Sequence, residues 1–262
     1  MGVLNVTPDS FSDGGNFFEL EKAIEHGLRM AAEGADIIDI GGESTRPGAE
    51  PIAADEELRR VIPVIEQLQA KIDLPISIDT SKSSVARAAI RAGASIVNDV
   101  TGGRGDEGTL PLVAETNSAL IIMHMQGTPK TMQNQPRYSD VVSEIADFFL
   151  QQYARSIGYN IDPMAIAFDP GIGFGKTLEH NLQVLAQLEQ LRTQDRPLVV
   201  GVSRKSFLSK VVDSRDLEDR LAPAVALTSL LRARGADVLR VHDVKENAGA
   251  LRITEAILRR AE

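Results

Sequence analysis

The sequence predicts an α/β fold, a (β/α)8 TIM barrel in which eight parallel strands form a ring surrounded by helices. Eight short β-branched or aliphatic runs alternate with amphipathic stretches of helical length, which is typical of βαβ units and a parallel sheet. The 262 residues match one such barrel, whose usual size is roughly 250 residues. No linker, low-complexity tract or composition shift divides the chain, so we expect a single domain over residues 1–262.

The eight apolar runs are the predicted strands: 3–6, 37–40, 76–79, 95–98, 119–123, 165–169, 198–202 and 238–242. Successive side chains of a strand point to opposite faces, so Ser77 and Asp79 share the face opposite the isoleucines beside them. The same alternation sets further polar residues apart from their hydrophobic neighbours: Asn5, Asn98, Asp169, Arg240 and His242. In a closed parallel barrel we expect this polar face at the C-terminal mouth, where such barrels place catalysis.

The amphipathic stretches between the runs are the predicted helices: 19–33, 55–69, 83–92, 108–117, 139–157, 177–191, 221–234 and 245–260. In the first of them the apolar residues recur with a period close to 3.6. An open doubly wound sheet is the main rival fold, and it normally carries phosphate-binding glycines directly after its first strand. Here that position is Asn5-Val6-Thr7-Pro8-Asp9, which favours the barrel.

The composition excludes several classes of function. A net charge of −9 argues against non-specific nucleic-acid binding, which needs a basic surface. No apolar run approaches the ~20 residues of a membrane-spanning helix. The start of the chain lacks a signal region. Without cysteine there is neither a disulfide framework nor thiolate chemistry. We therefore expect a cytoplasmic enzyme with no nucleic-acid or membrane partner.

Three polar side chains, Asp79, Asn98 and Asp169, end predicted strands on the inward face. Carboxylates only accept hydrogen bonds, whereas an amide both donates and accepts. Together they suit a flat heterocycle that carries amino, ring N–H and carbonyl groups. Two other interpretations stay open. Single Asp and Asn residues often cap nearby loops or helices, and the two aspartates with His242 could hold a cation. We favour the heterocycle over the metal.

The inward face after the last two strands holds Lys205, Arg240 and His242. Phosphate sites of these barrels frequently use the loops at this position, so we expect the three residues to gather negative charge. Arg204 has the opposite orientation, and we expect it to be a structural ion-pair partner or an outer-rim residue.

Three loops at the predicted mouth are rich in glycine or polar residues. Residues 5–15 form either a turn rich in Asx and Ser residues or a mobile lid. Residues 41–48 hold Arg46 between glycines and a proline, which suits an anion clamp. Residues 169–177 fail both the P-loop and the dinucleotide patterns, so their glycines indicate a tight turn that leaves room for a ligand.

Taken together, these segments resemble dihydropteroate synthase, a family of the pterin-binding barrel superfamily. The matching segments span nearly the whole chain: MGVLNVTPDSFSDGG, DIGGESTRPGA, ISIDTSK, IVNDVTGG, IIMHMQGTPKTMQ, FDPGIGFGK, VGVSRKSF and LRVHDVKEN. The family joins 6-hydroxymethyl-7,8-dihydropterin pyrophosphate to p-aminobenzoate in folate biosynthesis, with Mg²⁺ required. The resemblance implies a transferase that is a homodimer and a target of sulfonamides, which mimic p-aminobenzoate.

The resemblance also implies site residues. It assigns the pterin ring to Asp79, Asn98, Met123, Asp169 and Lys205. It assigns the pyrophosphate group to Asn5, which also matches the Mg²⁺ residue, and to Arg46, Arg240 and His242. It assigns p-aminobenzoate to Thr45, Pro47, Phe174 and Ser206, with Lys205 beside them. Asp13 matches a loop carboxylate that steadies a cationic intermediate, and with Lys205, Arg240 and His242 it completes the expected catalytic set.

Two departures from the family accompany the resemblance. We expect an N-terminal extension common in the family to be essentially absent, and residues 220–224 replace a glycine-containing start of the penultimate helix near the family's dimer surface. Two alternative functions stay open. A pterin-binding methyltetrahydrofolate methyltransferase module shares the Asp, Asn and Asp mouth but works with a cobalamin partner. A non-catalytic pterin carrier would bind without turnover.

Overall fold

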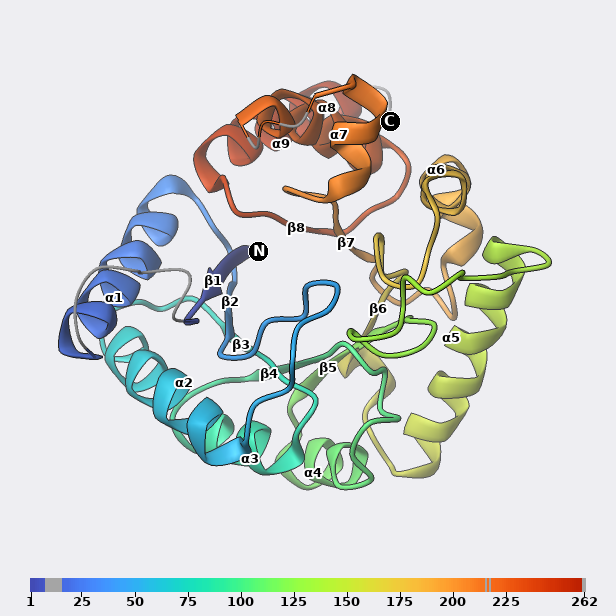
Figure 1. Cartoon of the computed structure of the whole chain (residues 1–262). Helices are drawn as coiled ribbons and strands as arrows, with labels where there is room; N and C mark the ends of the chain where they lie inside the picture. Colours follow the sequence, from blue (N-terminus) through green and yellow to red (C-terminus); the bar gives the residue numbers. More distant parts are fainter. Residues whose placement is uncertain (8–15, 215, 217, 261–262) are drawn as a thin grey trace.

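The computed structural model describes residues 1–7, 16–214, 216 and 218–260, and within them eight parallel strands form a ring inside a layer of helices (Figure 1). The strands are β1 (Gly2–Asn5), β2 (Ile38–Gly41), β3 (Ile76–Asp79), β4 (Ile96–Asp99), β5 (Ala119–Met123), β6 (Ile166–Asp169), β7 (Val199–Gly201) and β8 (Val238–Arg240). Strands β1 to β6 pair in chain order, and β7 pairs with β8. Bridges between Gly2 and Val241 and between Phe168 and Leu198 close the ring. The predicted barrel is confirmed.

The surrounding helices of the described residues are α1 (Asn16–Glu33), α2 (Ala54–Gln69), α3 (Ser83–Arg91), α4 (Thr109–Thr116), α5 (Val141–Gly158), α6 (Leu178–Ala186), α7 (Ser206–Val212), α8 (Leu221–Ala233) and α9 (Val244–Leu258). All eight predicted helices are present. The predicted helix 177–191 is interrupted at Gln187, and its second part is the 3-10 helix Leu188–Leu191. Helix α7 was not predicted, because seven residues are too few to establish a helical period.

The hydrophobic core lies between the ring and the helices. The isoleucines of β2 and β3 are fully buried, and they pack in one cluster with Val61, Ile65 and Leu68 on the inner face of α2. Burying one such side chain contributes about 1.5–3 kcal/mol. The alternation of apolar and polar residues along each strand therefore faces the isoleucines toward the helices and leaves their polar neighbours inside the ring.

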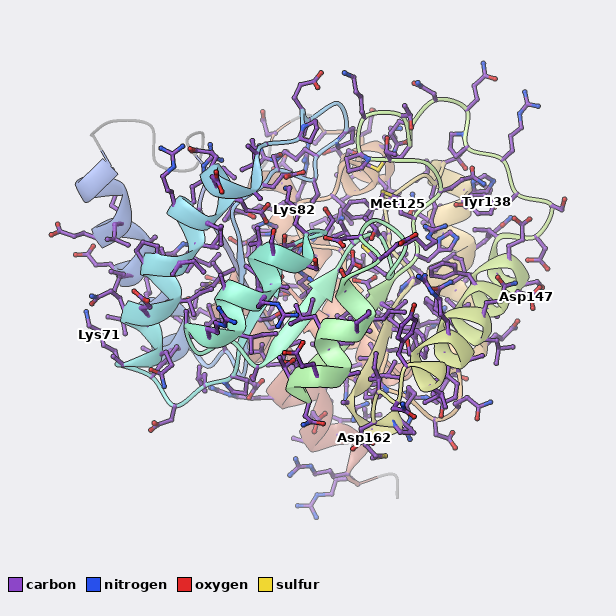
Figure 2. The ribbon with its side chains drawn as sticks, turned by 90° about the horizontal axis from the view of Figure 1, so that it is seen from below. Lys71, Lys82, Met125, Tyr138, Asp147 and Asp162 are labelled. Atoms are coloured by element: carbon purple, nitrogen blue, oxygen red, sulfur yellow. The ribbon has the colours of Figure 1, made fainter. Side chains whose placement is uncertain are left out.

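The strand register brings the C-terminal ends of neighbouring strands to the same level. Gly41 pairs with Asp79, Asp79 with Asn98, and Gly201 with Arg240. In the side view, Lys82, which follows β3, lies toward one end of the barrel, and Asp162, which precedes β6, lies at the other (Figure 2). The polar strand ends therefore meet at one mouth.

Among the described helices, none has the length and apolar character needed to cross a membrane.

Candidate active site

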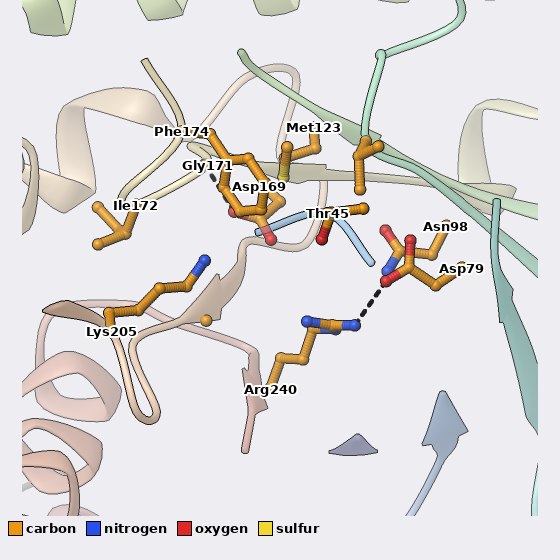
Figure 3. Close-up of a pocket in the computed structure, with 12 residues that line it drawn as sticks. Thr45, Asp79, Asn98, Met123, Asp169, Gly171, Ile172, Phe174, Lys205 and Arg240 are labelled. Carbon is orange, nitrogen blue, oxygen red and sulfur yellow. Dashed lines mark hydrogen bonds and ion pairs between the residues drawn. The ribbon is translucent and has the colours of Figure 1, made fainter. Parts of the chain in front are cut away.

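A polar cavity lies at this mouth (Figure 3). Its lining consists of Thr45, Asp79, Asn98, Val100, Met123, Asp169, Gly171, Ile172, Phe174, Gly201, Lys205 and Arg240. Six strand ends or the loops directly after them contribute charged or polar groups, although the residues lie far apart in the sequence. The structure thus brings together eight of the residues expected in the site: Thr45, Asp79, Asn98, Met123, Asp169, Phe174, Lys205 and Arg240.

Arg240 is fixed in the cavity by two carboxylates. Its Nη2 donates to Asp79 Oδ2 at 2.7 Å, and its Nε donates to Asp39 Oδ2 at 2.6 Å. Burial disfavours the charged guanidinium, but Asp39 and Asp79 outweigh this effect and raise the pKa of Arg240. Arg240 is therefore a permanent cation whose position is set jointly by β2, β3 and β8.

Asp39 was not among the predicted site residues, and it does not line the cavity. Its side chain is fully buried on β2, where it accepts a hydrogen bond from Asn98 Nδ2 at 3.2 Å as well as the bond from Arg240. Because Asn98 donates toward Asp39, its Oδ1 is left to accept a hydrogen bond from a ligand. Asp39 thus orients two cavity residues at once.

Asp79 presents a second acceptor. Its Oδ2 is bound by Arg240, whereas its Oδ1 is buried without a hydrogen-bond partner among the described residues. Burial raises the pKa of the Asp79 carboxyl to about 7, although Arg240 opposes that change. A buried polar atom without a partner costs free energy. A ligand that donates a hydrogen bond to Asp79 Oδ1 would remove this cost.

Asp169 stands at the start of a loop that packs closely on its neighbours. Its Oδ1 accepts from Gly171 N at 2.7 Å, and burial raises the pKa of its carboxyl. Gly171 has a φ of +64°, and a Cβ there would lie 2.0 Å from the His124 carbonyl oxygen. Only glycine fits this backbone. The predicted tight turn is therefore confirmed.

Lys205 supplies the donor that faces these acceptors. Burial and the nearby Arg240 lower the pKa of Lys205 to about 8, while Asp169 and Asp79 oppose the shift. Its Nζ lies 4.0 Å from the centre of the Phe174 ring, a cation–π contact across the cavity. Figure 3 shows the Lys205 amine pointing into the cavity between Asp169 and Arg240.

A second buried lysine, which was not among the predicted site residues, lies under the loop. Lys176 Nζ is 3.0 Å from His124 Nδ1 and donates to the carbonyl oxygens of Gly171 and Phe174 at 3.1 and 3.2 Å. Burial lowers the pKa of Lys176 to about 7 and that of His124 to about 2. These bonds hold the loop that presents Phe174 to the cavity.

Asp39 and Lys176, which were not predicted, differ in how well the sequence could have indicated them. Asp39 alternates with Ile38 and Ile40, so the strand rule that selected Asp79 also selects it. Lys176 follows a loop whose three glycines have positive φ, and its contact with His124 joins residues 52 positions apart. A local sequence pattern does not indicate a contact between residues so far apart in the chain.

Other predicted site residues lie outside the cavity lining. Asn5 ends β1 and is half-buried, and Ser206 begins α7. Arg46 and Pro47 are exposed on the loop between β2 and α2, which reaches over the ring in Figure 1. His242 follows β8 and contacts Ser203. The prediction for Asp13 concerns a residue outside the described part of the chain.

Two further observations bear on these loops. Gly48 N donates to Pro129 O at 3.1 Å, which ties the loop of Arg46 to the segment after β5. Arg204 pairs with Asp243 at 2.6 Å, so the predicted structural ion pair is confirmed.

Among the described residues there is no group of three or more His, Asp or Glu side chains that could hold a metal ion.

Known proteins are similar to this sequence over nearly its whole length. Residues 1–242 match the family described as pterin binding enzyme. A dihydropteroate synthase of Synechocystis is 46% identical over 259 residues, which covers 99% of this chain and 90% of the relative. The dihydropteroate synthase of Escherichia coli K12 is 46% identical over 258 residues, covering 98% of this chain and 91% of the relative.

Solved structures agree with the fold. A Yersinia pestis dihydropteroate synthase in a sulfonamide drug complex superposes with a TM-score of 0.93 at 44% identity, covering 99% of this chain and 94% of that one. A Xanthomonas albilineans dihydropteroate synthase with 4-aminobenzoic acid has a TM-score of 0.93 at 46% identity, covering 98% and 92%. By its family match, its relatives and its barrel, the chain belongs to the dihydropteroate synthases, a family of pterin-binding enzymes.

Proposed function

We propose that the cavity holds the ring of 6-hydroxymethyl-7,8-dihydropterin pyrophosphate while p-aminobenzoate attacks its methylene carbon, giving 7,8-dihydropteroate and pyrophosphate. One observation carries the proposal: the acceptors Asp79 Oδ1 and Asn98 Oδ1 and the carboxylate of Asp169 line one cavity with the donor Lys205. The dihydropterin ring has the complementary groups, namely an amino group and ring N–H groups that donate, and a carbonyl that accepts. Met123 packs against the ring face.

The substitution is dissociative in this proposal. The bond between the methylene carbon and the pyrophosphate oxygen breaks first, and its electron pair leaves with the pyrophosphate. The ring nitrogens delocalise the positive charge, and the carboxylates of Asp79 and Asp169 favour this cationic form. Arg240 and His242, joined by Arg46, stabilise the departing anion, and such pre-placed groups in a dry site contribute several kcal/mol, roughly 3–4 per donor.

The proposed cofactor is Mg²⁺, to which Asn5 would supply an amide oxygen. Mg²⁺ binds few protein oxygens and takes the rest from substrate phosphates and water. Asn5 is the last residue of β1, at the mouth, and it is half-buried. Asn5 would hold the ion beside the pyrophosphate group, and the bound ion would offset negative charge on the leaving oxygen.

The arylamine then attacks the methylene carbon and loses one proton to solvent. We propose that Thr45, Pro47, Phe174 and Ser206 hold p-aminobenzoate, with the Lys205 amine beside the Phe174 ring. Asp13 completes the proposal as a carboxylate that steadies the cation. An aniline nitrogen is weakly basic and needs no strong general base. The X. albilineans structure with 4-aminobenzoic acid supports p-aminobenzoate as a ligand of this chain, and the Y. pestis sulfonamide drug complex supports sulfonamides as ligands.

A product assay tests the proposed reaction. The enzyme with both substrates and Mg²⁺ should release dihydropteroate and pyrophosphate in equal amounts, and omission of p-aminobenzoate should abolish dihydropteroate. Methyl transfer from methyltetrahydrofolate to cobalamin, without this turnover, would instead support the methyltransferase module. Pterin binding with neither reaction would support a carrier.

The proposed assembly is a homodimer that uses the groove between α6, α7 and α8. Leu182, Val211 and Leu230 are exposed there, and nearly all of the groove lining is apolar. Exposed apolar side chains gathered in one groove are typical of a protein–protein contact surface. Light scattering after gel filtration should give twice the chain mass. Leu230→Glu should give a monomer, whereas the control Ile253→Glu, exposed on α9, should stay dimeric. A wild-type monomer would refute the dimer.

A further inference from the structure

Ser203 is a buried polar residue at the mouth that has no role in the proposed mechanism. The last paired residues of β7 and β8 are Gly201 and Arg240. Ser203 and His242 each follow two positions later, so the same register sets them side by side. Ser203 is 4% exposed, and His242 is its partner in two contacts. The serine hydroxyl is therefore committed to the histidine.

The two contacts fix which atom donates. The His242 backbone N lies 3.2 Å from Ser203 Oγ, and His242 Nδ1 lies 3.1 Å from the same oxygen. A backbone N–H can only donate, so Oγ accepts in the first contact. The hydroxyl keeps its own proton, and among the described residues Nδ1 is the one acceptor within reach of it. The hydroxyl therefore donates to Nδ1.

The surroundings of His242 keep its ring neutral. Burial lowers the pKa of His242 to about 3, and the nearby cations Arg204, Arg240 and Lys205 act in the same direction against the single carboxylate of Asp243. A neutral imidazole carries one ring proton. Because Nδ1 accepts the serine hydroxyl, that proton lies on Nε2. No described residue bonds Nε2, so it is available to a ligand.

We propose that Ser203 is a positioning residue that holds His242 as the Nε2–H tautomer, so that Nε2 donates to the pyrophosphate group as it departs. The other tautomer would present a lone pair to the anion and repel it. The hydrogen bond at one ring nitrogen thus decides what the other can do. The inference rests on the proposed role of His242 in binding pyrophosphate.

The tautomer can be measured directly. In protein labelled with ¹⁵N-histidine, long-range ¹H–¹⁵N spectra at pH 7 distinguish Nε2–H from Nδ1–H, and His242→Gln identifies the signals of His242. Wild type should show Nε2–H, and Ser203→Ala should shift the population toward Nδ1–H. An Nδ1–H signal in wild type, or an unchanged tautomer in Ser203→Ala, would overturn the inference.

Pyrophosphate binding provides the functional readout. In calorimetry with inorganic pyrophosphate and Mg²⁺, Ser203→Ala should weaken binding roughly two- to tenfold, the worth of one hydrogen bond. The same substitution should have no effect in a His242→Ala background, and additive effects would contradict the inference. Ser156→Ala is the matched control, because Ser156 is a buried serine of α5 whose hydroxyl has no partner among the described residues.

The roles of His242 and Ser203 can be refuted separately. If His242→Ala binds pyrophosphate as tightly as wild type, the role given to His242 in the proposed function is wrong. If His242→Ala weakens binding but Ser203→Ala changes neither the tautomer nor the affinity, the proposed function stands and Ser203 has no positioning role.

Discussion

Arg240 and Asp79 are joined across the mouth of the barrel by a hydrogen bond of 2.7 Å, from Nη2 of the arginine to Oδ2 of the aspartate. The bond connects the ends of β8 and β3, which are separated in the ring by β1 and β2. It leaves Asp79 Oδ1 without a partner among the described residues. The cavity is therefore preorganised for a ligand: one oxygen of the Asp79 carboxylate is bonded to Arg240, and the other can accept a hydrogen bond from the ligand.

Asp39→Asn should weaken pterin binding although Asp39 does not line the cavity. Asp39 Oδ2 accepts from both Asn98 Nδ2 and Arg240 Nε, and an uncharged amide oxygen in its place is a weaker acceptor, so Asn98 and Arg240 would be held less firmly in the orientation that the ligand needs. Breaking one side of a buried ion pair also costs about 3–5 kcal/mol of stability. Calorimetry with 6-hydroxymethylpterin and urea unfolding measure the two effects.

Glu115→Gln provides the comparison for Asp39→Asn. Glu115 pairs with Arg87 on the surface, where such pairs contribute about 0–1 kcal/mol. Glu115→Gln should leave both the pterin affinity and the free energy of unfolding close to wild type. Equal small effects in the two variants would contradict the role assigned to Asp39.

Asp79→Asn and Asp169→Asn should each weaken pterin binding by about 2–5 kcal/mol, as expected when a buried charged partner is lost. Both side chains line the cavity and are buried. Isothermal titration with 6-hydroxymethylpterin measures the change, with the exposed Asp147→Asn on α5 as the control. Wild-type affinity in either cavity variant would rule out that residue as a ring partner.

Gly171→Ala should abolish most activity. The alanine Cβ would lie 2.0 Å from the His124 carbonyl oxygen at a φ of +64°, so the loop that carries Phe174 must move. Gly158→Ala, at the end of α5, meets no atom within 4 Å and should be neutral or slightly stabilising. Comparison of kcat/KM and thermal unfolding for the two variants tests the packing argument, and normal turnover by Gly171→Ala would refute it.

The pH dependence of kcat/KM should be a narrow bell. Burial lowers the pKa of Lys205 to about 8, so its proton is present below that pH and is lost above it. Burial raises the pKa of Asp79 to about 7, so its anionic form is lost as the pH falls through that value. The maximum should therefore lie between these two values, because kcat/KM reports the groups of the free enzyme.

Lys205→Arg assigns the alkaline limb of that profile. Arginine keeps its proton throughout the accessible range, so the limb should move to higher pH even if the overall rate falls. Initial rates across the pH range in wild type and variant make the comparison. An alkaline limb at the same pH in both proteins would assign it to another group.

The strand ends of the site were predictable from the sequence because their rules are local. Alternation along a strand and the meeting of strand ends at one mouth bring Asp79, Asn98, Asp169 and Arg240 together without any knowledge of the loops. Asp39 obeys the same alternation but pairs with Ser77, one layer beneath the mouth, and was therefore overlooked. Alternation along a strand indicates which residues point inward. Their depth below the mouth determines which of them a ligand can reach.

The loops of the site were less predictable. The contact of Lys176 with His124 depends on the positive φ of three glycines and on the burial of a lysine among carbonyl oxygens, neither of which a local pattern reveals. The exposure of Arg46 likewise depends on how its loop meets the segment after β5. The positions of Lys176 and Arg46 follow from packing between distant segments. Sequence motifs can therefore identify residues of these loops but not where their side chains lie.

A crystal structure of the enzyme with 6-hydroxymethylpterin bound is the most direct measurement of the central claim. We expect the ring in the cavity of Figure 3, with its N–H groups on Asp79 Oδ1, Asn98 Oδ1 and Asp169 and its acceptors toward Lys205. A ring bound elsewhere, or a cavity in which Asp79 and Asp169 make no contact with it, would contradict the account.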